Sequence, residues 1–274
     1  MERILVQIYE IQEPREAEAL LGLGVDHMGS VLLSREAWKV PAVRDVMTLL
    51  EQEGVKSCLI PLFDDLEDLC RAVDYYEPRI LHFCEAVNLP YRESFETGRS
   101  WQFLYVLQDK LKGRYRDLEI MRSVPIPREG KGNVPAVRAA IENLADFFAP
   151  VSDWFLTDTL LGDLSTPGFH EEPVAGYVGI TGETCDWDLA AALVAKSPVP
   201  VILAGGLSPE NVCEGIQRVR PAGVDSCTRT NRVDADGRLV RFRKDPEKVR
   251  RLVAETRRAE TTIRTIRGRT KTDT

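Results

Sequence analysis

The sequence predicts one α/β domain, a (β/α)8 TIM barrel with inserted loops and a short C-terminal tail. Eight short apolar runs alternate with eight helical patterns along residues 1–258, and a parallel barrel of this kind needs about 250 residues. No Gly-x-Gly-x-x-Gly motif follows the first apolar run. An open doubly wound sheet that binds a dinucleotide is therefore the less favoured alternative.

The apolar runs have the length expected of buried parallel strands. They lie at residues 4–9, 26–33, 55–62, 79–83, 118–125, 154–159, 200–204 and 223–227. The helical patterns lie at residues 13–21, 35–53, 64–75, 99–112, 134–148, 186–196, 208–219 and 245–257. Because each strand is followed by a helix, the helices are expected to form a layer outside the sheet.

Local signals mark the ends of several helices. Pro14 lies just inside the first helical pattern, and Gly22 follows it, which is the usual placement of these two residue types. The seventh pattern begins with Ser-Pro-Glu-Asn at 208–211. The segments 86–115 and 159–181 are longer than ordinary connections, and the second is either a lid over a site or a surface insertion.

Charge and composition exclude several classes of protein. The formal net charge is −7, from 36 basic and 43 acidic residues, which does not fit a general nucleic-acid binder. No apolar run approaches the ~18 residues of a membrane helix, and the N-terminus does not resemble a signal peptide, so we expect a cytoplasmic protein without a membrane partner. Residues 259–274 are basic and are expected to form a flexible tail after a barrel at 1–258.

The cysteines and histidines give no sign of a metal site. The six cysteines form no Cys-x-x-Cys pair, and the three histidines are scattered along the chain. Neither pattern has the ligand spacing of a zinc site. We therefore expect reduced thiols, no metal and no cofactor.

A barrel also predicts where the chemistry lies, because active sites of this fold lie at the carboxyl ends of the strands. The polar or small residues at these ends are Tyr9-Glu10, Ser34-Arg35, 82–85, Asp158, Gly205-Gly206 and 225–229.

Several of these positions lie in motifs that resemble a known family. Residues 200–212 read Pro-Val-Ile-Leu-Ala-Gly-Gly-Leu-Ser-Pro-Glu-Asn-Val, and residues 182–187 read Gly-Glu-Thr-Cys-Asp-Trp. Together with 219–225 and 244–249, these segments resemble the C-terminal third of the phosphoribosylanthranilate isomerase family. The resemblance covers 3–256 and is strong over 182–250.

The resemblance implies a barrel enzyme of tryptophan biosynthesis that converts an aminoaldose phosphate into an aminoketose by an Amadori rearrangement. A general acid helps to open the ribose ring, and a general base then removes a proton from the carbon next to the imine. The implied partner is a small-molecule sugar phosphate, and the implied assembly is a monomer or homodimer. The alternative function is a non-catalytic or re-purposed barrel that binds a phosphorylated metabolite or a protein.

The resemblance gives a matching residue for the general acid but a different residue type at the position of the general base. Asp158 matches the general acid at the end of the sixth strand, although an aspartate there could also cap the following loop. Tyr9 stands where the family has the cysteine that acts as base, and a phenol with a pKa of ~10 is a poor base at neutral pH. Cys84 and Glu85 are the alternative bases, and Tyr9 is then an aromatic residue filling the barrel mouth.

The resemblance also implies substrate contacts. Arg35 would pair with the anthranilate carboxylate, which suits a bidentate guanidinium, or it is a solvated surface charge. His82 would contact the substrate or is a hydrogen-bonded residue of the mouth. Asp225 would contact the substrate or is paired with a neighbouring basic residue.

A phosphate site is expected after the seventh and eighth strands. Gly205 and Gly206 would let backbone N–H groups approach the phosphate ahead of a helix, and Thr228 and Arg229 follow the eighth strand. Arg229 replaces a glycine of the family and would either add a charge to this site or fill it. Glu183 replaces the lysine of the Gly-Lys-Thr motif, and its charge would repel a nearby phosphate.

Overall fold

The computed structural model describes residues 3–87, 100–130, 134–161, 174 and 176–272. Within them, eight parallel strands close into a barrel in chain order, because β1 pairs with both β2 and β8. The strands are β1 (Leu5–Ile8), β2 (His27–Leu32), β3 (Lys56–Pro61), β4 (Ile80–Phe83), β5 (Glu119–Pro127), β6 (Trp154–Leu160), β7 (Val201–Leu203) and β8 (Gly223–Ser226). The predicted (β/α)8 class is confirmed, and the open sheet is excluded.

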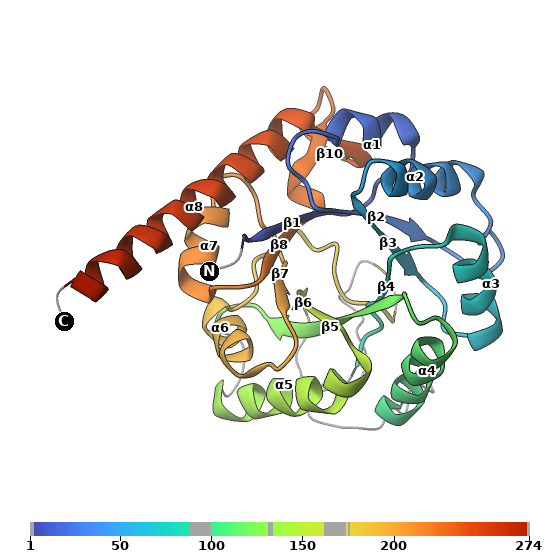
Figure 1. Cartoon of the computed structure of the whole chain (residues 1–274), viewed down its shortest axis with the longest axis horizontal. Helices are drawn as coiled ribbons and strands as arrows, with labels where there is room; N and C mark the ends of the chain where they lie inside the picture. Colours follow the sequence, from blue (N-terminus) through green and yellow to red (C-terminus); the bar gives the residue numbers. More distant parts are fainter. Residues whose placement is uncertain (1–2, 88–99, 131–133, 162–173, 175, 273–274) are drawn as a thin grey trace.

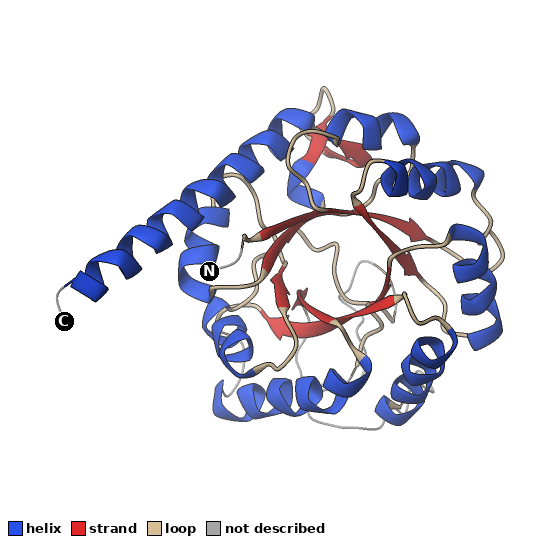
Figure 2. Cartoon of the chain, in the orientation of Figure 1, coloured by secondary structure: helices blue, strands red, loops and turns tan. Residues whose placement is uncertain are grey.

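Helices surround the barrel (Figures 1 and 2). They are α1 (Pro14–Leu20), α2 (Pro41–Gln52), α3 (Leu66–Tyr76), α4 (Trp101–Arg114), α5 (Val134–Phe148), α6 (Trp187–Lys196), α7 (Val212–Val219) and α8 (Pro246–Thr272). The side chains of Asp65 and Asp186 accept hydrogen bonds from the first backbone N–H groups of α3 and α6, which defines where these two helices begin. Apolar side chains fill the space between helices and sheet, and a smaller cluster fills the barrel interior.

Two helices, α2 and α7, begin four or more residues later than predicted. The pattern at 35–53 becomes helical only at Pro41, because proline keeps the preceding Val40 extended, with φ −114° and ψ 103°. The pattern at 208–219 becomes helical at Val212. Before it, the Asn211 side chain accepts a hydrogen bond from the Ser208 N–H at 2.8 Å and holds a turn.

A hairpin that the sequence analysis did not predict lies between β8 and α8. It is formed by β9 (Asn231–Val233) and β10 (Leu239–Lys244), which pair antiparallel. The buried Lys244 ammonium anchors it, donating to the Cys227 carbonyl at 2.8 Å and to the Asn231 side chain at 2.5 Å. The hairpin therefore has a fixed position beside the end of β8.

The C-terminal segment differs from the expected flexible tail. Helix α8 crosses position 258 without a break and continues to Thr272, and Figure 1 shows its last turns projecting beyond the barrel. Ala259 and Ile263 are fully buried, and the Glu260 carboxylate accepts a hydrogen bond from the Ile4 N–H at 2.5 Å. At least the first turns after 258 thus pack on the barrel. None of the helices that the structure describes is both long and apolar enough to span a membrane.

The two inserted segments lie partly outside the described residues. Of 86–115, the described part contains α4, and of 159–181, the described part includes residues 176–181 next to β4 and β6. The Ala86 N–H donates to the Gly176 carbonyl at 2.9 Å, and the Val178 N–H donates to the Cys84 carbonyl at 2.9 Å. This segment therefore lies against the carboxyl end of β4. Its role as a lid stays a prediction.

Candidate active site

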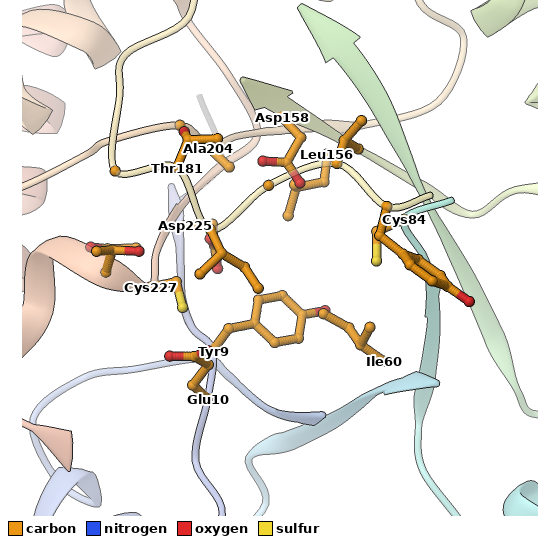
Figure 3. Close-up of a pocket in the computed structure, with 18 of the residues that line it drawn as sticks. Tyr9, Glu10, Ile60, Cys84, Leu156, Asp158, Thr181, Ala204, Asp225 and Cys227 are labelled. Carbon is orange, nitrogen blue, oxygen red and sulfur yellow. The ribbon is translucent and has the colours of Figure 1, made fainter. Parts of the chain in front are cut away.

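A pocket opens at the carboxyl end of the barrel, with a volume of about 800 Å³ including its open mouth. The ends of seven of the eight strands line it, β5 excepted, and residues 178–182 form one wall. The structure brings together nearly all the predicted site residues here, namely Tyr9, His82, Asp158, Gly205, Gly206, Asp225, Thr228 and Arg229. Figure 3 shows Tyr9, Glu10 and Cys227 on one side of the pocket and Asp158 on the other.

Arg35 is the predicted site residue that the structure does not bring into the pocket. Its guanidinium forms an ion pair with the carboxylate of Asp68, near the start of α3, and the Arg35 side chain is 59% exposed. Asp68 also pairs with Arg71. The nearby pocket wall is apolar and consists of Val31, Ile60 and Leu62. The alternative interpretation of Arg35, a solvated surface charge, therefore describes it better.

Tyr9 fills the centre of the barrel mouth. It is buried, its hydroxyl lies 2.8 Å from Nδ1 of His82, and a Cβ at Gly29 would lie 2.1 Å from its ring. The ring needs the space that the missing side chain of Gly29 leaves. Burial raises the pKa of the Tyr9 hydroxyl well above its usual value of 10.0. The hydroxyl stays protonated at neutral pH, so it fits an aromatic plug better than a base.

His82 joins Tyr9 to the predicted acid. Its Nε2 lies 2.9 Å from the Ser123 hydroxyl, which donates to Oδ2 of Asp158 at 3.4 Å. Burial lowers the pKa of His82 to about 3, so the imidazole is neutral at pH 7. One tautomer of His82 fits both hydrogen bonds: its Nε2–H donates to the Ser123 hydroxyl, and its Nδ1 accepts from the Tyr9 hydroxyl. Both nitrogens of His82 are therefore already engaged within the protein.

Ser123 is a functional candidate that sequence reasoning missed. It lies in the middle of β5, within a predicted strand but away from the strand ends where a barrel is expected to carry its active site. Its hydroxyl is buried and connects β4 with β6 through His82 and Asp158. A serine within an otherwise apolar run is a weak signal, because many such hydroxyls bond only to the backbone.

Asp158 projects from β6 into the pocket. Its Oδ1 accepts a hydrogen bond from the Thr159 N–H at 3.2 Å. A Cβ at Gly179 would lie 2.6 Å from Oδ2, and Gly179 has φ +110°. Glycine at this position lets the backbone pass directly over the carboxyl group. Asp158 is thus covered on one side by this segment and faces the pocket on another.

Asp225 lies on β8 opposite Gln7 of β1, and the Gln7 amide donates to its Oδ1 at 3.2 Å. The carboxyl is 6% exposed. Burial raises the pKa of Asp225 to about 7, and the Gln7 hydrogen bond and the nearby Lys244 charge only partly oppose this. At neutral pH this carboxyl is therefore close to half protonated and can both donate and accept hydrogen bonds.

The predicted phosphate site forms where the turns after β7 and β8 meet residues 182–184. Gly205 and Gly206 both have positive φ, +93° and +56°, and a Cβ at Gly206 would lie 2.7 Å from the Glu183 carbonyl carbon. The Arg229 Nε donates to the Gly182 carbonyl at 2.8 Å, and Thr228 begins a short 3-10 helix. These groups surround one end of the pocket.

Glu183 does not line this pocket, although its backbone packs against Gly206. Its neighbours Thr181 and Gly182 line the pocket instead. The repulsion expected from Glu183 is therefore weaker than the sequence suggests. Arg229 lines the pocket, and its Nε donates to the Gly182 carbonyl.

The two alternative bases are poorly placed. Burial raises the pKa of the Cys84 thiol well above 9.0, with Glu85 adding to the effect. The Glu85 side chain is fully buried, pairs with Arg122 at 2.6 Å and does not line the pocket. Among the described residues, no group of three or more His, Cys, Asp and Glu side chains is arranged to hold a metal ion.

Comparison with known proteins finds similarity to phosphoribosylanthranilate isomerases in both sequence and fold. Residues 148–254 match the model of the N-(5'-phosphoribosyl)anthranilate isomerase family. The N-(5'-phosphoribosyl)anthranilate isomerase of Haloferax volcanii is 39% identical over 143 residues, which are 52% of this chain and 53% of that protein. That of Methanosarcina acetivorans is 31% identical over 141 residues, again 52% of each. The chain spans about half the length of these curated relatives.

A solved structure extends the similarity to the whole barrel. The N-(5'-phosphoribosyl)anthranilate isomerase of Pyrococcus furiosus superposes with a TM-score of 0.63 at 19% identity, covering 93% of this chain and 100% of that one. Similarity at this identity shows the fold, whereas the sequence similarity covers about half of the chain. The chain is thus similar to N-(5'-phosphoribosyl)anthranilate isomerases in sequence over about half of its length and in fold over the whole barrel.

Proposed function

We propose that the chain catalyses the Amadori rearrangement of phosphoribosylanthranilate, or of a closely related aminoaldose phosphate, in tryptophan biosynthesis. One observation carries the proposal. The carboxyl group of Asp158 lies in the same pocket as the glycine turn of Gly205-Gly206 and the Thr228-Arg229 turn. A proton donor and an anion cradle in one pocket are what an aminoaldose phosphate requires.

In this proposal the phosphate lies against the backbone of Gly205 and Gly206, with the Arg229 guanidinium beside it. Phosphate sites of TIM barrels are commonly built from these two turns. The Asp158 carboxyl donates a proton to the ring oxygen, the carbon–oxygen bond breaks, and the nitrogen lone pair forms the imine. Asp225, close to half protonated at pH 7, hydrogen-bonds a sugar hydroxyl.

We also propose that the protein is cytoplasmic and works without a cofactor or metal, as a monomer or homodimer. The family similarity supports this environment, and the acid–base chemistry above uses only side chains of this chain. The 178–182 wall of the pocket supports a lid role for that segment.

Turnover of phosphoribosylanthranilate by the purified protein tests the proposal, together with rescue of a tryptophan auxotroph that lacks this isomerase. Asp158→Asn should lower kcat by ~100- to 10,000-fold, because an amide cannot supply the proton. Asp188→Asn, at an exposed carboxylate paired with Arg218, is the matched control and should leave turnover unchanged. A folded wild-type protein that binds a sugar phosphate without converting it would favour the non-catalytic alternative.

A further inference from the structure

We propose that Glu10 is the general base of this reaction and that Arg241 is its positioning residue. The inference rests on the proposed function and supplies the part that Tyr9 leaves open. Glu10 directly follows the position where the family has its cysteine. Arg241 lies on the hairpin between the last strand of the barrel and the last helix.

The Glu10 side chain has the features of a group prepared to accept a proton. It is 1% exposed but lines the pocket, and its Oε1 accepts a hydrogen bond from the Arg241 Nε at 2.5 Å. Its other oxygen, Oε2, is buried and has no N–H or O–H donor among the described residues, although the Cys227 thiol lies beside the carboxylate. Buried carboxylate oxygens are seldom left unpaired, because the lost hydration is not replaced. A ligand in the pocket would supply the missing partner.

The backbone of Glu10 points to the same conclusion. Its φ is +64°, a left-handed conformation that favours glycine and that a glutamate rarely adopts. Unfavourable backbone conformations of this kind collect at functional sites, where the surrounding structure maintains them. Here the conformation accompanies a carboxylate held in the pocket wall.

The hairpin explains how the carboxylate is held. Arg241 lies on β10, and the buried Lys244 at the end of that strand fixes the hairpin to Cys227 and Asn231 beside β8. The Lys244 N–H also donates to the Glu16 side chain of α1 at 3.0 Å. The hairpin therefore reaches from β8 to the α1 side of the barrel, as Figure 1 shows. From there the guanidinium occupies one oxygen of Glu10 and leaves the other available.

The other groups in the pocket fit the role less well. Tyr9 and Cys84 are buried, and burial raises the pKa of each. Burial also raises the pKa of the Cys227 thiol, and the neighbouring Glu10 carboxylate adds to this effect. Asp158 is assigned as the acid. Asp225 is the remaining competitor, because a pKa of about 7 suits a general base, but its Oδ1 already accepts from Gln7.

The carboxyl groups of Glu10 and Asp158 together account for every proton that moves in the reaction. After ring opening, the Glu10 carboxylate removes the proton from the sugar carbon next to the protonated imine. The electron pair of that C–H bond forms a carbon–carbon double bond, and the C=N electrons return to nitrogen. The enolamine then becomes the aminoketose as the Glu10 proton passes to the former imine carbon and the enol proton returns to Asp158. Both groups recover their starting states.

The test compares Glu10→Gln, Glu10→Asp and Glu10→Gly with the wild type on phosphoribosylanthranilate. Glu10→Gln should lower kcat by ~100- to 10,000-fold while KM changes little, and Glu10→Asp should recover part of the loss. Glu10→Gly suits the left-handed backbone and should fold well, and added formate should restore part of its kcat. Rescue by an external carboxylate is not expected of a residue that is merely structural.

Arg241 has its own test and control. Arg241→Gln should lower kcat more than it raises KM, with partial recovery in Arg241→Lys, whereas Arg238→Gln on the same hairpin, 80% exposed, should behave as wild type. If Glu10→Gln keeps kcat within about threefold of wild type while Asp225→Asn loses it, the base is Asp225 and the inference is overturned. A wild-type protein without turnover overturns the proposed function itself, so the two failures are distinguishable.

Discussion

The Tyr9 hydroxyl lies 2.8 Å from Nδ1 of His82, and this hydrogen bond begins a chain that ends at Asp158. The residue at the family's base position is thus connected to the residue at the acid position through groups that are neutral at pH 7. The hydrogen bond holds the imidazole in place, and the raised pKa of the Tyr9 hydroxyl leads us to expect that it does not act as the base.

Tyr9→Phe should therefore lower kcat less than tenfold, against the ~100-fold or greater loss expected on removing a base. The free energy of unfolding should fall by ~1–3 kcal/mol, because the Nδ1 acceptor of His82 loses its buried partner. Urea denaturation and steady-state kinetics measure the two effects. Tyr76→Phe, which removes a hydroxyl bonded to the Trp38 carbonyl at 2.6 Å outside the pocket, is the control for losing a phenol. A kcat loss of ~1,000-fold in Tyr9→Phe alone would restore the phenol as base.

Arg35→Ala should leave the KM for phosphoribosylanthranilate within about twofold of wild type, because the guanidinium pairs with Asp68 outside the pocket. Arg229→Ala provides the contrast, since Arg229 lines the pocket at the phosphate end, and its KM should rise. Initial rates at varied substrate concentration measure both constants. A large KM increase in Arg35→Ala would mean that this loop turns inward when substrate binds.

Gly206→Ala should be more destabilising than Gly54→Ala, although both residues have positive φ, +56° and +69°. In each variant, the left-handed backbone conformation of the alanine lowers the free energy of unfolding by ~1–2 kcal/mol. A Cβ at Gly206 also meets the backbone of 182–184 at 2.7–2.8 Å, whereas Gly54 has nothing within 4 Å. The overlap adds ~1–3 kcal/mol, and it should weaken sugar-phosphate binding at the same time. Equal losses of stability in the two variants would show that the close approach of Gly206 to the backbone of 182–184 does not affect stability.

We expect the contribution of Asp225 to the free energy of unfolding to fall as the pH rises from about 4 to about 7. Its folded pKa, about 7, lies above the usual 3.8, so over this range the folded state binds a proton that the unfolded state has released. The contribution to the free energy of unfolding then falls by up to ~1.4 kcal/mol per pH unit. His27 and His82 act in the opposite direction, because burial lowers their pKa values to about 4 and about 3.

The difference between wild type and Asp225→Asn separates these opposing contributions, because the histidines are common to both proteins. The asparagine oxygen can still accept from Gln7, so the variant keeps the hydrogen bond at 3.2 Å. Denaturation at a series of pH values should show a stability that rises more steeply, or falls less, with pH in the variant. Parallel pH curves for the two proteins would contradict the raised pKa.

The barrel and the location of Asp158 and Gly205-Gly206 at its mouth were predictable because the information is local. Each strand is an apolar run, and Asp158 and the Gly205-Gly206 pair lie at the ends of such runs, which a barrel brings to one face. Arg35 has the same kind of position, but the direction of its side chain depends on Asp68, which lies in the next βα unit. An ion pair between two βα units leaves no recognisable pattern in the sequence around Arg35.

The hairpin and the end of α8 were missed for different reasons. The exposed strands β9 and β10 carry alternating charged residues and lack an apolar run. The basic residues after 257 suggested solvation, whereas Ala259 and Ile263, four residues apart, mark a buried helical face. The importance of Glu10 followed only from the fold, because its partner Arg241 lies 231 residues away in the chain.

The contact between Glu260 and the Ile4 N–H has a consequence for how the protein is made. It joins residues 256 positions apart, and the Arg257 guanidinium donates to the Ile4 carbonyl at 2.7 Å beside it. The first strand therefore gains this contact, and its pairing with β8, only after most of the chain has been made. Contacts of such long sequence separation form late and slow the folding of a chain. The contact of α8 with Ile4 is accordingly among the last to form, and a chain ended at 258 would lack it.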